Sequence, residues 1–511
     1  MNAGAAASSY GQILRSSSII GGAQGINYVI SLVKTKVVAV LLGPSGVGLV
    51  GLYVATIGMI ETLAGLGVRS SGVREIADAN SSGDPESLAR TLKTLRRACW
   101  LTGILGWILL AALAYPLSVW VFDSPEYAVA LAILGCTLVF SSVSGGQMAL
   151  IQGVRRIGDL ARLTLLGVAV GTIVSLPIYY FLGERGIVPV LVVSAVLNLI
   201  FSWWFARKIK VVTVQQSVGE TVTRMKSLLS LGVAFMWSAL LGAGVALIIR
   251  AIIQRELGLE ANGLYQAAWA ISGMFAGFIL GAMGADFYPR LTAAKGDSAL
   301  MGRLVNEQTE VGILLALPGL VATLAFAPWI MTLLYSEEFV GAAELLPWFI
   351  LGVFGRVVSW PMGFIMLALG EGKWFAASET VSVFVHAVLA IVLIGFLGLW
   401  GVALAFAVLY LLYTALVSCI AFHLIRFRWS VLVLRMLFAS SVLVVLAFML
   451  TQMAQGLPAA FVGMLLTLAA ALYSVRGLAR RLGDNHRLVA MACQVPLGRV
   501  LCGLPLNSRQ V

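Results

Sequence analysis

Apolar runs bounded by charged or turn residues follow one another from one end of the chain to the other. Each run is about 20 residues long, which is the length of a helix that crosses a lipid bilayer. The pattern therefore predicts an all-α polytopic membrane protein with about fourteen transmembrane helices. The predicted spans begin near Ser16, Val47, Ala98, Tyr127, Ala161, Gly186, Ser227, Ala261, Gln308, Gly341, Trp374, Leu399, Val433 and Leu457.

The composition agrees with a membrane protein and excludes a water-soluble fold, and we expect a transporter rather than an enzyme. Hydrophobic residues make up 60% of the 511 residues and charged residues only 11%, against about 25% charged residues in soluble proteins. The N-terminus lacks the positive region of a signal peptide, and the first apolar segment is too long for a signal-peptide core, so we expect it to be kept as a span. The five cysteines contain no C-x-x-C pair and the three histidines stand apart, so neither a disulfide framework nor a zinc site is expected.

Two nucleotide-binding signatures can be set aside. GVGLVG at residues 46–51 matches a dinucleotide-binding pattern, but it opens a membrane helix and follows no strand. The chain has no G-x-x-x-x-G-K-[ST] loop, so ATP is not expected to drive it. We expect a transporter without a cofactor.

The connections between spans differ in charge on the two sides of the membrane. One side has short, uncharged or acidic links, such as GPSG at 43–46, DSPE at 123–126 and SEEF at 336–339. Of the 34 lysines and arginines, 28 lie on the side of the N-terminus, and only Arg185 and Arg255 lie on the other side. The positive-inside rule then places both termini in the cytoplasm. The net charge of +12 follows from this topology and implies no nucleic-acid partner.

The two halves of the chain resemble each other at offsets of 213 to 217 residues. The alignment pairs Gly43 with Gly258 and Gly48 with Gly263. The three recurring segments are LLGPSGVGLVGLY (41–53) with ELGLEANGLY (256–265), GDPESLARTL (83–92) with GDSALMGRLV (296–305), and ALIQG (149–153) with MLALG (366–370).

This repeat predicts the domain organisation. Six spans precede the second copy, so both copies enter the membrane from the same side. We expect an N-terminal lobe of six helices at 1–215 and a C-terminal lobe of six helices at 216–428. Two further helices at 429–475 and a basic cytoplasmic tail at 476–511 have no counterpart in the repeat. In transporters built this way the ligand binds near the midplane between the repeats, and one lobe rocks against the other.

Four cations lie within the spans, namely Lys34, Lys36, Arg250 and Arg356. A charge at the bilayer centre costs about 2.5 to 3.5 kcal/mol on insertion scales, so each needs a reason. Lys34 and Lys36 are about 200° apart around a helix and cannot both face one cleft. Lys36 is close enough to Gly43 to snorkel to the surface, whereas Arg356 lies near the midplane. The cations either pair with buried acids or line a positively charged cleft that binds an anion.

Few acids are placed to neutralise these cations. Glu61 is the one acid expected deep in a span, and it is level with Asn27 rather than with Lys36. We therefore favour the positively charged cleft. Glu61 is a candidate carboxylate for ion or proton coupling, and the alternative is a polar contact with Asn27 or Gln24. Glu379 and Asp286, near the inner ends of spans, are weaker candidates.

The N-terminal region carries a resemblance to a known family. SSSIIGGAQGINYVISLVKTKVVAVLLGPSGVGLVGLY at 16–53 and SSGVREIADA at 70–79 resemble the O-antigen translocase group of polysaccharide exporters, within the multidrug/oligosaccharidyl-lipid/polysaccharide (MOP) flippase superfamily. The resemblance implies a flippase of the bacterial inner membrane. It would move an undecaprenyl-pyrophosphate-linked oligosaccharide, used in lipopolysaccharide synthesis, from the cytoplasmic to the periplasmic leaflet by alternating access.

The resemblance also suggests the site and the partners. Members of this group line a central cavity with basic residues, a role that Lys34, Lys36, Arg250 and Arg356 match here. The implied partners are the lipid-linked glycan and bilayer lipids, and polysaccharide polymerase machinery is the candidate protein partner.

Three other functions stay open at this point. A lipid II flippase of peptidoglycan synthesis shares the fourteen-span plan. A drug or cation antiporter of the same superfamily would carry acids in its first and seventh spans, where this chain has Lys34, Lys36 and Arg250. A non-transporting subunit of a glycan assembly complex would have no need of Arg356 at the midplane.

Overall fold

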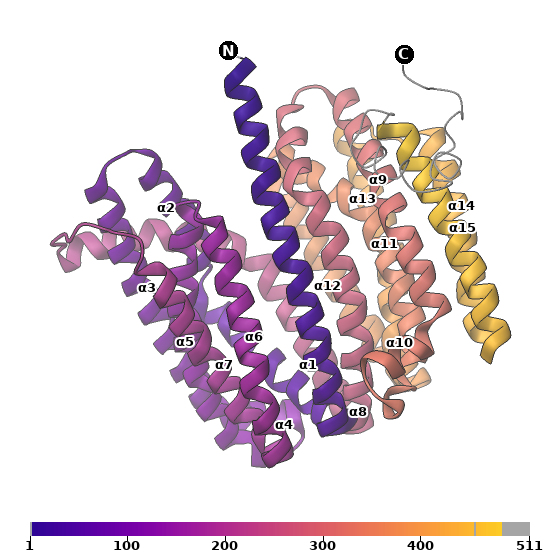
Figure 1. The fold of residues 1–511 in the computed structure, drawn as a ribbon, viewed down its shortest axis with the longest axis horizontal. Helices are drawn as coiled ribbons and strands as arrows, with labels where there is room; N and C mark the ends of the chain where they lie inside the picture. The colour runs from indigo at the N-terminus through magenta and orange to yellow at the C-terminus, as the bar shows by residue number, and fades with distance from the viewer. Residues whose placement is uncertain (1–2, 454–455, 483–511) are drawn as a thin grey trace, which may run out of the picture. The chain divides into compact units, whose positions relative to one another are not determined.

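A computed structural model describes residues 3–453 and 456–482, and this part of the chain is helical without a strand (Figure 1). Within it, 11 stretches are long and apolar enough to cross a membrane. Three of them, Gly25–Gly65, Ile157–Ala206 and Met236–Met274, contain 41, 50 and 39 residues. Each of these three is long enough for two crossings of about 20 residues. The described chain therefore accommodates fourteen crossings, and the predicted all-α membrane fold is confirmed.

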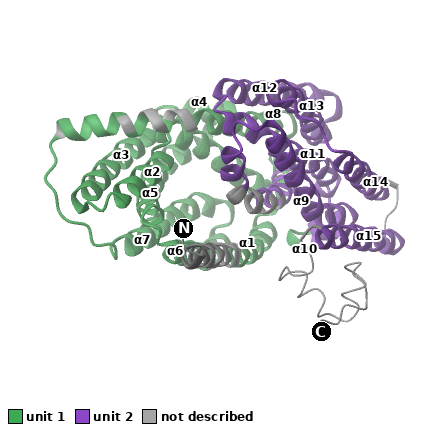
Figure 2. Cartoon of the chain, turned by 90° about the horizontal axis from the view of Figure 1, so that it is seen from above, with its two compact units in different colours: residues 1–263, 334–336 green, residues 264–333, 337–511 purple. Residues whose placement is uncertain are grey.

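The chain divides into two compact units, coloured separately in Figure 2. The first unit comprises residues 1–263 and 334–336, and the second comprises residues 264–333 and 337–511. This division lies further along the chain than the predicted lobe boundary at 215/216. The reason is that the seventh span packs with the first unit, where Leu247 and Ala251 join the buried cluster around Leu52 and Leu131. The lobe boundaries derived from the repeat stay a prediction.

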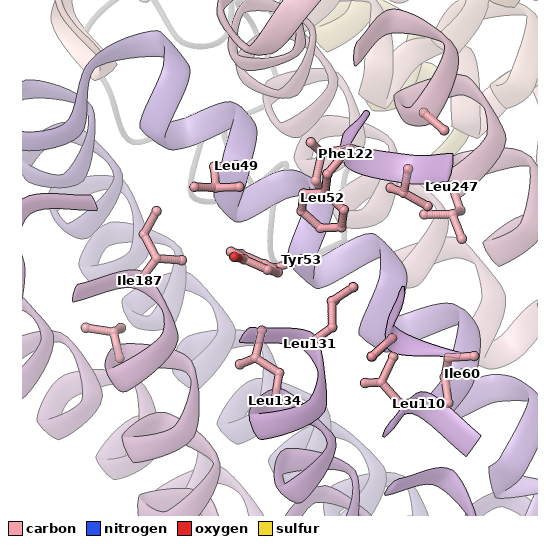
Figure 3. Packing of buried hydrophobic residues seen from close by; sticks show 14 of the residues in the cluster. Leu49, Leu52, Tyr53, Ile60, Leu110, Phe122, Leu131, Leu134, Ile187 and Leu247 are labelled. Carbon is pink, nitrogen blue, oxygen red and sulfur yellow. The ribbon is translucent and has the colours of Figure 1, made fainter. Parts of the chain in front are cut away.

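The first unit is held together by an apolar core that includes aromatic rings (Figure 3). Tyr53 is 3% exposed, and its ring centroid lies 5.0 Å from that of Phe122. Phe122 in turn stacks on Tyr127 at 4.9 Å. The helices of this unit are α1 (Ala3–Gly65), α2 (Val68–Ser81), α3 (Pro85–Ala112), α4 (Ala114–Phe122), η1 (Pro125–Tyr127), α5 (Ala128–Gly153), α6 (Ile157–Leu182), η2 (Gly183–Gly186), α7 (Ile187–Ala206) and the first part of α8 (Val218–Ala293).

The second unit contains the two helices that have no counterpart in the repeat, α14 and α15, and both pack against α9. Helix α15 continues to Leu482, beyond the predicted start of the tail at residue 476, and the rest of the tail lies outside the described residues. The helices of this unit are the second part of α8, α9 (Ser298–Ala325), α10 (Ala327–Leu334), η3 (Glu337–Phe339), α11 (Ala342–Leu369), α12 (Gly372–Leu397), α13 (Leu399–Ile425), α14 (Val431–Met453) and α15 (Gly456–Leu482).

The helices of the two copies recur in the same order and with matching lengths. Helices α3 and α9 both have 28 residues, and each begins after an aspartate, Asp84 or Asp297, whose side chain accepts a hydrogen bond from a backbone N–H of the first turn. A short helix follows each of them, and the later pair α6 and α12 has 26 residues each. The internal repeat is therefore confirmed at the level of individual caps and helix lengths.

Two equivalent glycines make the sharp turns that join crossings within one helix. Gly43 in α1 has φ 63° and ψ −174°, and Gly258 in α8 has φ 84° and ψ −177°. Only glycine adopts this backbone conformation readily, because a side chain would clash there. The same strained residue at an offset of 215 places a one-residue turn at the same point of each copy.

The next pair of equivalent glycines lies side by side in the first unit. A Cβ at Gly48 would collide with the carbonyl oxygen of Leu259 and would lie 2.8 Å from the amide nitrogen of Gly263. A Cβ at Gly263 would collide with the carbonyl oxygen of Pro44. Because both obstacles are backbone atoms, the two turns can approach this closely only with glycine at both positions.

Candidate functional site

A polar cavity of about 380 Å³ lies in the first unit, at the C-terminal end of α1. Its polar wall includes Glu61, Arg69, Thr102, Ser141 and Ser142, which come from α1, α2, α3 and α5. The hydroxyl of Ser141 donates a hydrogen bond of 2.5 Å to Oε1 of Glu61. A carboxylate exposed to the cavity is therefore positioned by a hydroxyl from a neighbouring helix.

Arg69 contributes the positive charge of this cavity. Its side chain runs along α5, since a Cβ at Gly145 would lie 3.5 Å from Cδ of Arg69. Among the described residues no ion pair within 4.0 Å joins Arg69 to Glu61. The cavity thus holds an acid and a base that do not neutralise each other by direct contact.

A second polar cavity, of about 270 Å³, lies in the second unit between α11, α12 and α13. Arg356 is half-buried in its wall, with its guanidinium carbon 5.9 Å from the centroid of the Tyr410 ring. The hydroxyl of Tyr413 donates a hydrogen bond of 2.8 Å to Oε1 of Glu379, which lines the same cavity. Within the described part of the chain Arg356 forms no ion pair. Its guanidinium group instead makes a cation–π contact with the ring of Tyr410.

The two cavities are formed by different sets of helices, and α5 and α11 are the one equivalent pair that they share among the described elements. At the offsets of 214 to 217 that relate α5 to α11, Arg356 falls on the turn at 139–142, which contains Ser141. Each cavity is lined by one carboxylate and at least one guanidinium, so neither shows a surplus of positive charge by itself. The predicted positive cleft concerns the space between the repeats, and it stays a prediction.

The two lysines of the first span lie on different faces of α1. Val29, Val33 and Val40 are 62%, 55% and 60% exposed, and Lys36 lies on the same stripe at helical spacing. Lys34 is seven residues after the buried Asn27 and therefore lies on the face of Asn27. Both ammonium groups are on half-buried side chains. The structure thus assigns Lys36 to the exposed apolar face and Lys34 to the packed face.

Arg250 lies inside the first unit and is only 6% exposed. Its Nη1 donates a hydrogen bond of 2.9 Å to the carbonyl oxygen of Ala246, one turn earlier in α8. Its own carbonyl oxygen accepts a hydrogen bond of 2.9 Å from Asn262, which follows the turn at Gly258. The residue therefore bridges the two sides of the turn in α8, and it does not face lipid.

The alternative role considered for Glu61 is a polar contact with Asn27 or Gln24. In the described structure its hydrogen-bond partner is Ser141, and Oδ1 of Asn27 has no hydrogen-bond partner. Glu61 is also not the only acid deep in a span, because Glu310 lies in the interior of α9 and is 9% exposed. The depth of Glu310 was not recognised from the sequence, because α9 begins ten residues before the predicted start at Gln308. The side chains of Gln24 and Asp286 lie outside the described side chains.

Several lining residues were missed from sequence. Tyr410 and Tyr413 are three residues apart on one face of α13, a spacing that could have indicated a polar face within an apolar span. Arg69, in the first turn of α2, lines the first-unit cavity and was not a candidate from the sequence. Among the described residues no group of three or more His, Cys, Asp or Glu side chains is arranged to hold a metal ion.

The sequence is similar to those of two curated flippases. The chain is 23% identical to the lipid III flippase of Escherichia coli K12 over 415 residues, which cover 78% of this chain and 95% of that protein. The same figures hold for the lipid III flippase of Shigella flexneri.

Solved structures share the fold at low sequence identity. The lipid II flippase MurJ in an inward closed conformation matches with a TM-score of 0.67 and 12% identity, covering 90% of this chain and 98% of that chain. An inward-facing multidrug resistance MATE transporter of the MOP superfamily matches with a TM-score of 0.63 and 17% identity, covering 78% of this chain and 94% of that chain. A MOP superfamily transporter from Pyrococcus furiosus matches with a TM-score of 0.58 and 16% identity, covering 80% and 95% of the two chains.

The decisive match is to a family profile. The profile described as "polysaccharide biosynthesis protein" matches residues 13–295, which is more than half of the 511 residues. The matched region includes both glycine turns, the first-unit cavity and Arg250. This multi-pass membrane protein, which has the fold of the MOP superfamily, therefore belongs to the polysaccharide biosynthesis protein family.

Proposed function

We propose that this protein is a flippase that moves a lipid-linked oligosaccharide, joined to its lipid through pyrophosphate, from the inner to the outer leaflet of a bacterial inner membrane. The observation that carries the proposal is the family match over residues 13–295. The similarity to proteins named lipid III flippase, which extends over 95% of their length, supports the same class of cargo. The O-antigen repeat unit is the cargo suggested by the N-terminal sequence resemblance.

The cavities supply chemistry that suits such a cargo. Arginine donates paired hydrogen bonds to phosphate oxygens, and the half-buried Arg356 is available for this because no described carboxylate is bound to it. Tyr410 lines the same cavity, and its ring lies against the guanidinium of Arg356. The same arginine argues against a function as an antiporter of cationic drugs, because its positive charge would repel such drugs.

The direction of transport agrees with the membrane potential. An inside-negative membrane potential favours the outward movement of an anion by about 2.3 kcal/mol per charge per 100 mV. A pyrophosphate carrier would therefore run outward even without a coupled ion. Coupling at Glu61 would add control over direction rather than supply the whole driving force.

A lipid II flippase is the second candidate. The MurJ structure covers 90% of this chain, whereas the MATE structure covers 78%. The fold likeness to MurJ thus extends over more of the chain, which suits a carrier with the fourteen-span plan. The two flippase candidates differ only in the glycan, so one assay with two substrates separates them.

The test measures the leaflet in which a lipid-linked sugar resides. Purified protein is reconstituted into vesicles with a lipid-linked repeat unit or with lipid II, and a sugar-modifying enzyme that cannot cross the bilayer reports exposure. We expect protein-dependent exposure of pyrophosphate-linked glycan, and we expect the O-antigen or lipid III type to exceed lipid II. If the sugar of every substrate were equally exposed with and without protein, the flippase proposal would be wrong and a non-transporting role would remain.

The coupling role of Glu61 gives a separate prediction. In Glu61→Gln the amide oxygen still accepts the hydrogen bond from Ser141, but the charge is gone. We expect the flipping rate of this variant to stop responding to an imposed proton or sodium gradient to which the unmodified protein responds. Glu184→Gln, at an exposed position in η2, is the matched control. If the flipping rate of Glu61→Gln responded to the gradient as before, Glu61 would have no coupling role and would serve only as the hydrogen-bond acceptor of Ser141.

A further inference from the structure

A third cavity, of about 620 Å³, lies at one end of the second unit, where α9 begins, α13 ends and the linker to α14 starts. Its wall carries Arg303, Arg426, Arg428 and His423 and contains no aspartate or glutamate. In the described residues none of the three arginines forms an ion pair within 4.0 Å. This cavity is therefore a basic pocket, the basic pocket of the second unit.

The linker that carries two of these arginines is fixed to α9 by one amide side chain. Asn306 donates a hydrogen bond of 3.2 Å to the carbonyl oxygen of Arg428 and accepts one of 2.8 Å from the backbone N–H of Ser430. It also donates to the carbonyl oxygen of Gly302 in its own helix at 2.8 Å. Because Asn306 is itself only 9% exposed, these hydrogen bonds are shielded from water, and they attach the linker to α9.

The side chains of the linker alternate between the interior and the surface. Phe427 is 5% exposed and its ring lies 4.9 Å from that of Trp429, whereas Arg426 and Arg428 on either side of it are exposed. Arg426 adopts φ 55°, a left-handed conformation that usually falls to glycine at the end of a helix. Its guanidinium carbon lies 5.4 Å from the centroid of Phe422. An arginine therefore occupies a position where a glycine would suit the backbone better.

The basic pocket lies at the level of lipid headgroups. The spans on its borders end at Ile425 and begin at Val431 and Ser298. The ring of Trp374 lies 5.7 Å from that of His423, and tryptophan is typical of the boundary between hydrocarbon and headgroups. By the positive-inside rule this is the cytoplasmic side, where anionic phospholipids concentrate basic groups.

We propose that the basic pocket binds the phosphate group of an anionic phospholipid of the inner leaflet. Arginines satisfy phosphate oxygens with paired hydrogen bonds, and the exposed lining of three arginines and one histidine leaves a positive charge that the described protein does not compensate. The headgroup depth selects a membrane lipid over a soluble phosphate. The inference goes beyond the proposed function, because lipid binding at this pocket does not depend on whether the protein transports a glycan.

The test measures lipid affinity of the full-length protein in detergent by native mass spectrometry. Phosphatidylglycerol is titrated against phosphatidylethanolamine, with Arg426→Gly, Arg428→Gln and the control Arg435→Gln, which is exposed in the first turns of α14 and outside the pocket. We expect Arg426→Gly and Arg428→Gln each to weaken phosphatidylglycerol binding about fivefold. We expect no change in phosphatidylethanolamine binding and no change in the control.

The glycine variant separates a binding role from a folding role. Because glycine relieves the left-handed strain, Arg426→Gly should melt at the temperature of the unmodified protein or above it while it loses lipid. Unchanged phosphatidylglycerol affinity in both pocket variants would overturn the proposal. Displacement of the lipid by an equal concentration of inorganic phosphate would overturn it too, because the pocket would then be a site for soluble anions. The outcome of the flipping assay does not enter this test.

Discussion

A Gly263→Ala variant is expected to lose about 3 kcal/mol of folding stability and with it most of its flipping activity. The added methyl group would collide with the carbonyl oxygen of Pro44, and a backbone atom cannot move aside as a side chain can. Gly48→Ala should behave alike, because its methyl group would collide with the carbonyl oxygen of Leu259. The measurement is the fraction of protein that stays monodisperse in detergent after heating through a temperature series.

Gly242 provides the matched control within the same helix. It also lies in α8, but a Cβ there would meet no heavy atom within 4 Å. Alanine is favoured over glycine in a helix by about 1 kcal/mol, so Gly242→Ala should melt at or above the temperature of the unmodified protein. If Gly263→Ala and Gly242→Ala melted alike, the close approach of the two turns would not hold in the protein.

Arg356→Ala is expected to lower the flipping rate about tenfold to a hundredfold without lowering the amount of protein in the membrane. Hydrogen bonds to a charged group contribute about 1.5 to 3 kcal/mol, and the variant removes such donors from the second-unit cavity. It also removes the positive charge that shares this cavity with Glu379, so the cavity becomes more negative and less favourable for pyrophosphate. The rate is measured in the vesicle assay, with surface polysaccharide in cells as a second readout.

Two further variants show whether charge is the cause. Arg356→Lys keeps the positive charge and should retain part of the rate, although it loses the paired donors. The double variant Arg356→Ala/Glu379→Gln removes both charges and should transport faster than Arg356→Ala alone. Arg185→Ala, at an exposed position in η2, should leave the rate unchanged. A normal rate in well-expressed Arg356→Ala would exclude Arg356 from the path of the cargo.

The sequence predicts the fold well because its strongest signals are local. Apolar runs of bilayer length identify the spans, and the glycines at 43 and 258 mark turns that only this residue allows. The ion pair between Arg255 and Asp123, at 3.6 Å, joins two links that the charge pattern had placed on the same side. Span starts were less accurate, as for α9, because its polar first turns extend beyond the apolar run.

The sites were harder to predict because they depend on contacts between distant segments. Glu61 and Ser141 are 80 residues apart, and nothing in either segment identifies the other as its partner. Arg356 was identified from its depth alone, whereas its neighbours Tyr410 and Glu379 depend on how α11, α12 and α13 pack. A count of charges also missed Glu310, since burial of a carboxylate in α9 follows from packing and not from composition.

The single-residue turns at Gly43 and Gly258 have a consequence for experiments on intact cells. A turn of one glycine leaves no loop for a protease to cleave or for an antibody to bind, and inserted residues would separate backbones that touch at Gly48 and Gly263. Epitope tags for mapping the face that the charge pattern predicts to be periplasmic therefore belong in the acidic links at 123–126 or 336–339. Tags at the glycine turns would report on misfolded protein.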